Sequence, residues 1–277
     1  MTVLEVLTAA TEYLRKQGVE SPRLNAEHLL AHVLGKKNRI ELYLEFERPL
    51  SDPQRAPLRD LVRRRGEGVP LQHLLGTVEF LGYTLATDSR ALIPRPETEQ
   101  LVEFVLDEGS WSSVWDIGTG TGAIALSLAL KRPEAGVSAG DISLEALSLA
   151  RENAARHDLG ERITFFESDL LAAFHGPVDA IVANLPYIPT GDMAGLSREV
   201  GYDPVLALDG GADGLDLVRR LAGGAAEKLA PGGILALEVG HDQGTRTADI
   251  LAKHNFRDIS IRRDYQNIER FLIARHG

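Results

Sequence analysis

The sequence predicts an α/β protein in which a mostly parallel sheet, covered by helices, follows a small bundle of helices. From residue 113 onward, short apolar runs alternate with stretches of helical periodicity, which is the pattern of parallel strands joined by crossover helices. Residues 1–75 lack these runs and instead place leucines at helical spacing between capping and stop signals. Residues 256–275 contain two β-like runs separated by polar residues, which predicts an antiparallel hairpin at the end of the sheet.

Local signals divide the chain into three parts. Residues 1–75 form the helical part, in which Ser21, standing before a proline, is a predicted helix cap. Residues 76–93 hold two short β-rich runs around Gly82 and are predicted to form a β-hairpin linker. Residues 94–277 begin with a proline-stiffened connector and contain the alternating strands and helices.

Composition narrows the classes of function. The 277 residues include no cysteine, which excludes disulfides, thiolate-ligated metal clusters and a cysteine nucleophile, and which fits a cytoplasmic enzyme. No apolar run is long enough to cross a membrane, and Glu5 and Glu12 fall where an export signal would be basic and then apolar, so no such signal is expected. The histidines lack the spacing of metal ligands, so no metal site is expected.

The net charge of −10 is distributed unevenly along the chain. Residues 1–75 carry 12 Lys and Arg against 10 Asp and Glu, whereas the remainder carries 18 against 30. Because an acidic main part matches a nucleic-acid backbone poorly, stable nucleic-acid binding is not expected.

A strand, a glycine-rich turn and a helix follow one another in VWDIGTGTG, residues 114–122. The glycines of this turn permit positive φ and a close approach of the backbone to a ligand. Asp141 ends the next predicted strand, 23 residues after Gly118, where a carboxylate can accept both hydroxyls of a ribose. Together these features predict a nucleoside-cofactor site.

The turn also indicates which nucleoside cofactor it suits. It lacks the Gly-Lys-Ser/Thr of a phosphate-binding loop, and Asp116 would repel a diphosphate, which disfavours NAD, whereas the same acid would favour a sulfonium and an α-amino group. The Asp-x-Gly-x-Gly-x-Gly form resembles the first motif of class I S-adenosylmethionine-dependent methyltransferases, whose sheet is Rossmann-like. The resemblance makes Asp141 the ribose-binding acid and places Ser168, Asp169 and Leu170 around the adenine. The residues assigned to cofactor binding are Asp116, Gly118, Thr119, Gly120, Thr121, Gly122, Asp141, Asp169, Leu170 and Asn184.

The predicted strand at residues 178–184 ends in the motif Asn184-Leu185-Pro186-Tyr187, which is called the tip below. Ligands of a doubly wound sheet bind at the carboxyl ends of its strands, so this tip would face the methyl donor. The Asn184 side-chain oxygen and the Leu185 carbonyl can accept the two N–H bonds of a planar nitrogen. Pro186 holds the preceding residue extended and so aims its carbonyl, and the Tyr187 ring can stack on a flat substrate group. These four residues are the candidate catalytic and substrate-binding residues.

The tip resembles the Asn/Asp-Pro-Pro-Tyr motif of amino-methyltransferases, which act on adenine amines or glutamine amides. Further motifs distinguish adenine from glutamine as the substrate. Before and after the motifs already described, the chain contains, in this order, PLQHLLGTVEFLGYTL, LIPRPETEQLVE, DPVLALDGGADGL and LAPGGILALEVGHDQG. Across essentially the whole chain the sequence resembles the HemK/PrmC family, the peptide chain release factor glutamine methyltransferases. This resemblance implies S-adenosylmethionine-dependent N5-methylation of the glutamine in the Gly-Gly-Gln loop of class I release factors. It also implies that the helical part docks that protein partner, with the loop entering a cleft between the two domains.

Two positions depart from the family pattern: Leu185 stands where proline is usual, and Asp203 stands where many members have glutamate. Because the expected hydrogen bond uses the main-chain carbonyl of residue 185, activity is expected to survive the first departure. The alternative functions are an amino-methyltransferase acting on adenine in RNA or DNA, one acting on a glutamine of a ribosomal protein, and a non-catalytic nucleoside-binding partner protein. A role in the substrate cleft and a structural role both stay open for Arg95, Glu97, Glu99 and Glu238.

Overall fold

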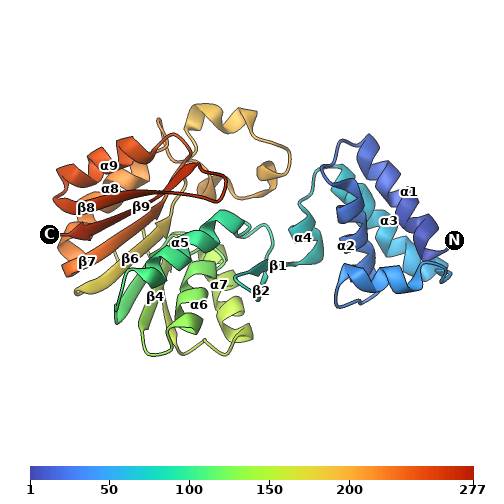
Figure 1. The fold of residues 1–277 in the computed structure, drawn as a ribbon, viewed down its shortest axis with the longest axis horizontal. Helices are drawn as coiled ribbons and strands as arrows, with labels where there is room; N and C mark the ends of the chain where they lie inside the picture. The colour runs from blue at the N-terminus through green and yellow to red at the C-terminus, as the bar shows by residue number, and fades with distance from the viewer. The chain divides into compact units, whose positions relative to one another are not determined.

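The computed structural model describes all 277 residues, and their contacts group them into two units. The smaller unit contains Met1–Thr77 together with Ser197–Tyr202, and the larger contains Val78–Leu196 and Asp203–Gly277. The order of the elements along the chain can be followed by colour in Figure 1. None of the helices is long and apolar enough to span a membrane.

The smaller unit is helical, as predicted. Thr2 caps its first helix, because the Thr2 hydroxyl accepts from the Glu5 N–H and the Glu5 carboxylate accepts from the Thr2 N–H. Ser21 stands at the N-cap of the second helix and Pro22 begins that helix, as predicted. Ser21 makes no side-chain cap bond, because its φ of 48° departs from the extended backbone that this bond requires. Fully buried leucines from three segments form the core of this unit. Its elements are α1 (Val3–Lys16), α2 (Pro22–Val33), η1 (Arg39–Glu45), α3 (Asp52–Gly66), α4 (Leu71–Leu75) and η3 (Val200–Tyr202).

The larger unit contains the predicted sheet. Its strands lie in the order β5-β4-β3-β6-β7-β9-β8, and the first five are parallel. The last two strands form the predicted antiparallel hairpin, and β9 is also antiparallel to β7. The strands are β3 (Ser113–Ile117), β4 (Gly136–Asp141), β5 (Ile163–Glu167), β6 (Val178–Asn184), β7 (Leu229–Glu238), β8 (Phe256–Arg263) and β9 (Glu269–His276). A separate two-stranded sheet pairs β1 (Thr77–Phe80) with β2 (Tyr83–Ala86).

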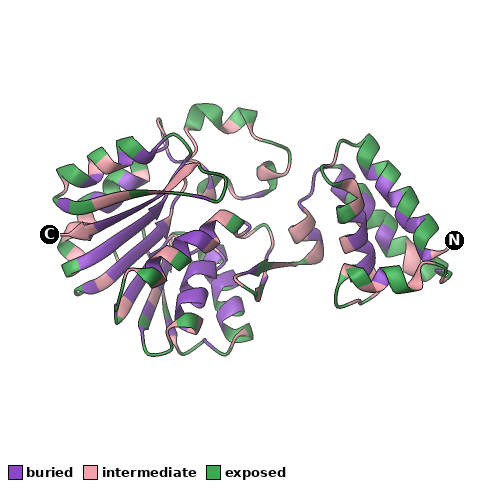
Figure 2. Cartoon of the chain, in the orientation of Figure 1, coloured by how far each residue is buried: buried purple, intermediate pink, exposed green.

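Helices cover both faces of the seven-stranded sheet. In β6, Ala180 and Val182 pack into one apolar cluster with α5 and α6, whereas Ile181 and Ala183 pack into a second cluster with α8 and α9. This alternation follows from the two-residue period of a strand, and it makes the central strands buried on both sides (Figure 2). The helices are α5 (Pro96–Asp107), α6 (Ala123–Lys131), α7 (Leu144–Arg156), α8 (Asp216–Lys228) and α9 (Gly244–Lys253), with short turns η2 (Thr190–Gly195) and η4 (Val205–Ala207).

The strand order creates the position for a ligand. From β3 the chain moves outward through β4 to β5 and then returns to β6 on the other side of β3. The connections that leave β3 and β6 therefore diverge, which opens a crevice at their carboxyl ends. Because Ile117 pairs with Ala183, the glycine turn after β3 and the tip after β6 are neighbours.

Candidate active site

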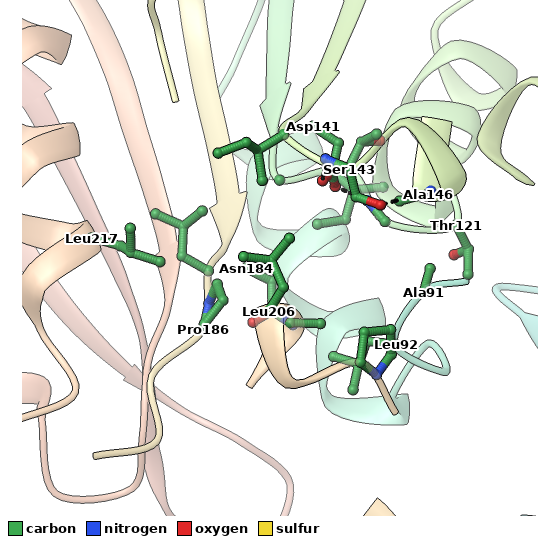
Figure 3. A pocket seen from close by; sticks show the side chains of 18 of the residues that line it. Ala91, Leu92, Thr121, Asp141, Ser143, Ala146, Asn184, Pro186, Leu206 and Leu217 are labelled. Atoms are coloured by element: carbon green, nitrogen blue, oxygen red, sulfur yellow. Dashed lines mark hydrogen bonds between the residues drawn. The ribbon is translucent and has the colours of Figure 1, made fainter. Parts of the chain in front are cut away.

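A cavity of about 300 Å³ lies at the carboxyl ends of the strands, and all of its wall belongs to the larger unit (Figure 3). Three residues predicted for the site, Asp116, Gly122 and Tyr187, are not part of this wall. The predicted residues that line it are Gly118, Thr119, Gly120, Thr121, Asp141, Asp169, Leu170, Asn184, Leu185 and Pro186. The structure thus brings together residues from the turn after β3, the ends of β4 and β5, and the tip after β6.

The three glycines of the turn have different neighbours. Gly118 has φ of 73°, and a Cβ there would lie 3.0 Å from Cδ2 of Leu185, so its lack of a side chain makes room for the strand tip. A Cβ on Gly122 would lie 2.7 Å from Cδ1 of Leu126, so this glycine serves the packing of α6. Only Gly120 opens toward the cavity without a close neighbour, with the nearest atom 3.9 Å from its would-be Cβ. A ligand can therefore approach the backbone most closely at Gly120.

Asp116 lies beneath the turn and is fully buried. Its Oδ2 accepts hydrogen bonds from Thr119 Oγ1 (2.6 Å) and from the Ala125 N–H (3.1 Å), while Oδ1 has no protein partner. Burial raises the pKa of Asp116 to about 7, against the opposing effect of these hydrogen bonds. Asp116 is placed to hold the turn against the start of α6, and its direct contact with a cofactor stays a prediction.

Asp141 stands on the cavity wall at the end of β4, as predicted. Its two oxygens accept from the N–H groups of Gly120 and Ser143, each at 2.9 Å, which fixes the carboxylate beside the turn. Burial is the largest influence on Asp141 and raises its pKa. Each oxygen keeps a further lone pair for a hydroxyl donor, so the carboxylate can still receive a diol.

The end of β5 is tied to α8. Asp169 Oδ2 forms an ion pair with Arg220 Nη2 at 2.6 Å, and Leu170 has φ of 51°, in the left-handed region that favours glycine. Ser168 Oγ donates to the Leu170 carbonyl at 2.8 Å and so supports this conformation. Sequence reasoning missed Arg220, because no local pattern connects a helix at residue 220 with a strand that ends at residue 167.

The Asn184 amide is held from behind by two other elements. Asn184 Nδ2 donates to Thr98 Oγ1 at 3.0 Å, and Thr98 Oγ1 donates to Glu238 Oε2 at 2.7 Å. Thr98 belongs to the first turn of α5, and Glu238 ends β7, where it pairs in register with Asn184. Thr98 and Asn184 line the cavity, whereas Glu238 is buried behind them.

The loop before α8 fixes the main chain beyond the tip. The Ile188 N–H donates to the Leu208 carbonyl at 3.0 Å, and the Gly210 N–H donates to the Ile188 carbonyl at 2.8 Å. Gln243 Nε2 donates to the Tyr187 carbonyl at 2.8 Å. The main chain at Tyr187 and Ile188 is therefore held by contacts that do not involve the side chain of residue 185.

Comparison with known proteins identifies the family. The PrmC N-terminal domain profile matches residues 5–76, and the Methyltransferase small domain profile matches residues 96–195. The release factor glutamine methyltransferase of Deinococcus radiodurans is 45% identical over 280 residues, covering 100% of this chain and 99% of the relative, and that of Moorella thermoacetica is 43% identical over 99% and 98%. The chain belongs to the PrmC/HemK family of release factor glutamine methyltransferases.

The fold of this family member is shared with more distant methyltransferases. The T. thermophilus 16S rRNA N2 G1207 methyltransferase, solved in complex with AdoMet and guanosine, is 19% identical, with a TM-score of 0.53 over 73% of this chain and 50% of that one. A methyltransferase from Pyrococcus furiosus is 18% identical, with a TM-score of 0.55 over 71% and 90%. The predicted Rossmann-like methyltransferase fold with an N-terminal helical domain is confirmed.

The PrmC/HemK cavity fits S-adenosylmethionine, the methyl donor of this enzyme class. At Gly120 a ligand can approach the main chain closely, and the Asp141 carboxylate can accept hydrogen bonds from a ribose diol. Apolar residues of the wall suit an adenine ring. The apolar residues, which sequence reasoning mostly missed, are Ile142, Leu170, Leu206 and Leu217. Leu206 comes from η4 and Leu217 from α8, so their approach to the cofactor turn depends on the loop between β6 and α8.

Replacing Asp141 tests the cofactor assignment. In Asp141→Asn one acceptor oxygen becomes an NH₂ donor and the charge is lost, so we expect the affinity for S-adenosylmethionine to fall about 10- to 100-fold. Isothermal titration calorimetry measures the dissociation constant directly. The exposed Glu145, four residues along the chain, provides the control Glu145→Gln, for which we expect an unchanged constant. Equal affinities of the two variants would remove Asp141 from the cofactor site.

Asp203, one of the two departures from the family pattern, makes defined contacts. Its Oδ2 pairs with Arg95 Nη2 at 2.7 Å, and its Oδ1 accepts from the Ile93 N–H at 3.3 Å. The shorter acid therefore still ties the segment before α5 to the loop after β6. Arg95 itself lines the cavity.

Proposed function

We propose that this chain transfers a methyl group from S-adenosylmethionine to the side-chain amide nitrogen of the glutamine in the Gly-Gly-Gln motif of class I peptide chain release factors. The observation that carries this proposal is the orientation of the Asn184 amide, whose NH₂ end is bound by Thr98. Asn184 lines the cavity, and its hydrogen bond to Thr98 uses only the NH₂ group, which leaves Oδ1 available as an acceptor for a substrate N–H. The full-length relatives support the substrate, since they are release factor glutamine methyltransferases.

The proposed mechanism relies on holding a weak nucleophile in place. The lone pair of an amide nitrogen is delocalised, and S-adenosylmethionine supplies a methyl group on a good leaving group. Asn184 Oδ1 and the Leu185 carbonyl accept the two N–H bonds, which fixes the nitrogen and favours the charge that develops on it during transfer. Pro186 restricts Leu185 to an extended backbone and so maintains the direction of its carbonyl.

Tyr187 follows the acceptor pair in the chain but is not part of the cavity wall. Its side chain is half-buried, and burial raises the pKa of its hydroxyl, so the phenol stays neutral at physiological pH. We assign the ring to stacking on the flat amide of the substrate. Because residue 185 acts through its main-chain carbonyl in this mechanism, a leucine there retains the acceptor.

The helical unit is proposed to dock the release factor. The PrmC N-terminal domain profile covers nearly all of it, and its sequence carries a slight excess of Lys and Arg. The acceptor pair at Asn184 would also suit the exocyclic amine of adenine, so the tip by itself does not choose between the two substrates. The acidic composition of residues 76–277 supports the protein substrate over a nucleic acid.

Labelling of a purified release factor tests the proposed function. We expect radioactive methyl from S-adenosylmethionine to enter the wild-type release factor and to add one methyl group to the Gly-Gly-Gln peptide in a mass spectrum. The release factor with its Gly-Gly-Gln glutamine replaced by alanine should stay unlabelled. Label on total RNA or on a ribosomal protein, with none on the release factor, would overturn the proposal.

A further inference from the structure

The side chains of Asn184, Thr98 and Glu238, from three different elements, form one hydrogen-bond chain. The chain runs from Asn184 Nδ2 to Thr98 Oγ1 and from Thr98 Oγ1 to Glu238 Oε2, over 3.0 and 2.7 Å. We propose that Thr98 and Glu238 are positioning residues, which keep the Asn184 oxygen turned to the substrate while Glu238 is ionised and release it when Glu238 is protonated. This inference rests on the proposed function, because it concerns the acceptor that Asn184 offers to the substrate amide.

The direction of the chain follows from counting protons. An ionised carboxylate can only accept, so the single hydroxyl proton of Thr98 must go to Glu238. The Thr98 oxygen can then only accept from its other neighbour, and Asn184 must turn its NH₂ group toward it. The Asn184 oxygen is thereby directed into the cavity, which is the orientation required to receive an N–H of the substrate.

Protonation of Glu238 removes this constraint. A neutral carboxyl group can donate to the Thr98 oxygen, and the Thr98 hydroxyl is then free to donate to the oxygen of Asn184. In that arrangement the amide is rotated by half a turn and presents NH₂ to the cavity. Because a donor facing the N–H groups of an amide substrate repels them, the rotated form is inactive.

The surroundings of Glu238 bring its titration into the physiological range. Glu238 is 3% exposed, and burial is the largest influence, raising its pKa to about 7. Glu97 of α5 raises the pKa of Glu238 further, whereas the hydrogen bond from Thr98 and the charge of Arg270 of β9 lower it. Tyr187, whose pKa is raised by burial and by the charge of Glu238, is neutral in this range. The rate of methyl transfer should therefore rise with pH through a midpoint near 7.

Glu238→Gln imitates the protonated acid without changing its size. We expect its kcat for release-factor methylation to be about 10- to 100-fold below that of the wild type, with the step near pH 7 absent and the affinity for S-adenosylmethionine unchanged. Thr98→Val interrupts the chain and should also lower kcat, whereas Thr98→Ser keeps the hydroxyl and should restore most of the rate. Glu97→Gln removes a neighbouring negative charge and should move the wild-type step to lower pH.

A second measurement separates this inference from the proposed substrate. In ¹⁵N-labelled enzyme, the side-chain NH₂ signal of Asn184, assigned by its absence from Asn184→Ala, should shift with a midpoint near pH 7 in the wild type and stay constant in Glu238→Gln. This readout requires no substrate, so it applies even if release factors are not methylated. A wild-type rate and pH profile in Glu238→Gln, or an Asn184 signal that titrates equally in both proteins, would overturn the positioning role.

Discussion

Replacing Asn184 by alanine should reduce methylation of the release factor about 10²- to 10³-fold while the affinity for S-adenosylmethionine changes little. The reason is that the substitution removes the side-chain acceptor proposed for the reacting nitrogen, a loss comparable with removing one preorganised group that stabilises developing charge. The donor site retains its main contacts, because the turn after β3 and Asp141 are held by their own hydrogen bonds. Steady-state kinetics with purified release factor, together with calorimetric titration of the cofactor, measures both quantities.

The exposed Thr190 provides the control for this substitution, because it lies six residues after Asn184 and outside the cavity wall. Thr190→Ala removes the hydrogen bond from Thr190 Oγ1 to Asp209, a residue that lines the cavity and is also held by the Gly211 N–H, and should keep both the rate and the cofactor affinity. Unchanged turnover in Asn184→Ala would refute the assigned role. A parallel loss of cofactor binding would instead assign Asn184 mainly to the cofactor.

Gly210→Ala should displace the catalytic tip although residue 210 contacts no substrate in the proposed mechanism. A Cβ at this position would lie 2.6 Å from the carbonyl oxygen of Pro186 and 2.8 Å from Cα of Tyr187. These are main-chain atoms, so relief requires the backbone of the tip to move. We expect kcat to fall at least about 10²-fold, since displacement by about an ångström misaligns the acceptors, and we expect about 1–3 kcal/mol of lost stability from the overpacking.

Gly191→Ala is the matched control, because Gly191 lies in the same connection, is exposed, and has open space around its would-be Cβ. It should keep the rate and the unfolding free energy close to the wild-type values. Chemical denaturation gives the stability of each variant, and kinetics with saturating cofactor gives kcat. A fully active Gly210→Ala would mean that the tip tolerates displacement and that its main-chain geometry does not limit the rate.

Much of the fold was predictable because its signals are local. The alternation of apolar runs and helical periods from residue 113 predicted the parallel sheet, and the polar break within residues 256–275 predicted the closing hairpin. At Ser21 the residue type predicts the N-cap position correctly, but the side-chain cap bond is missing because it depends on a backbone conformation that the residue type does not determine.

The sequence by itself determined that the glycine turn, the acid at the end of β4 and the tip after β6 lie at one site, because each is a short motif attached to a recognisable strand. Only the tertiary structure decided which partners support them. Thr98 and Glu238 are 140 residues apart, and Glu238 reaches Asn184 because β7 pairs with β6 in one particular register. Hydrophobic periodicity specifies that a strand exists and which face is buried, but the order and register of strands arise from packing of the whole sheet. The direction in which the Asn184 amide points is therefore a property of the folded chain.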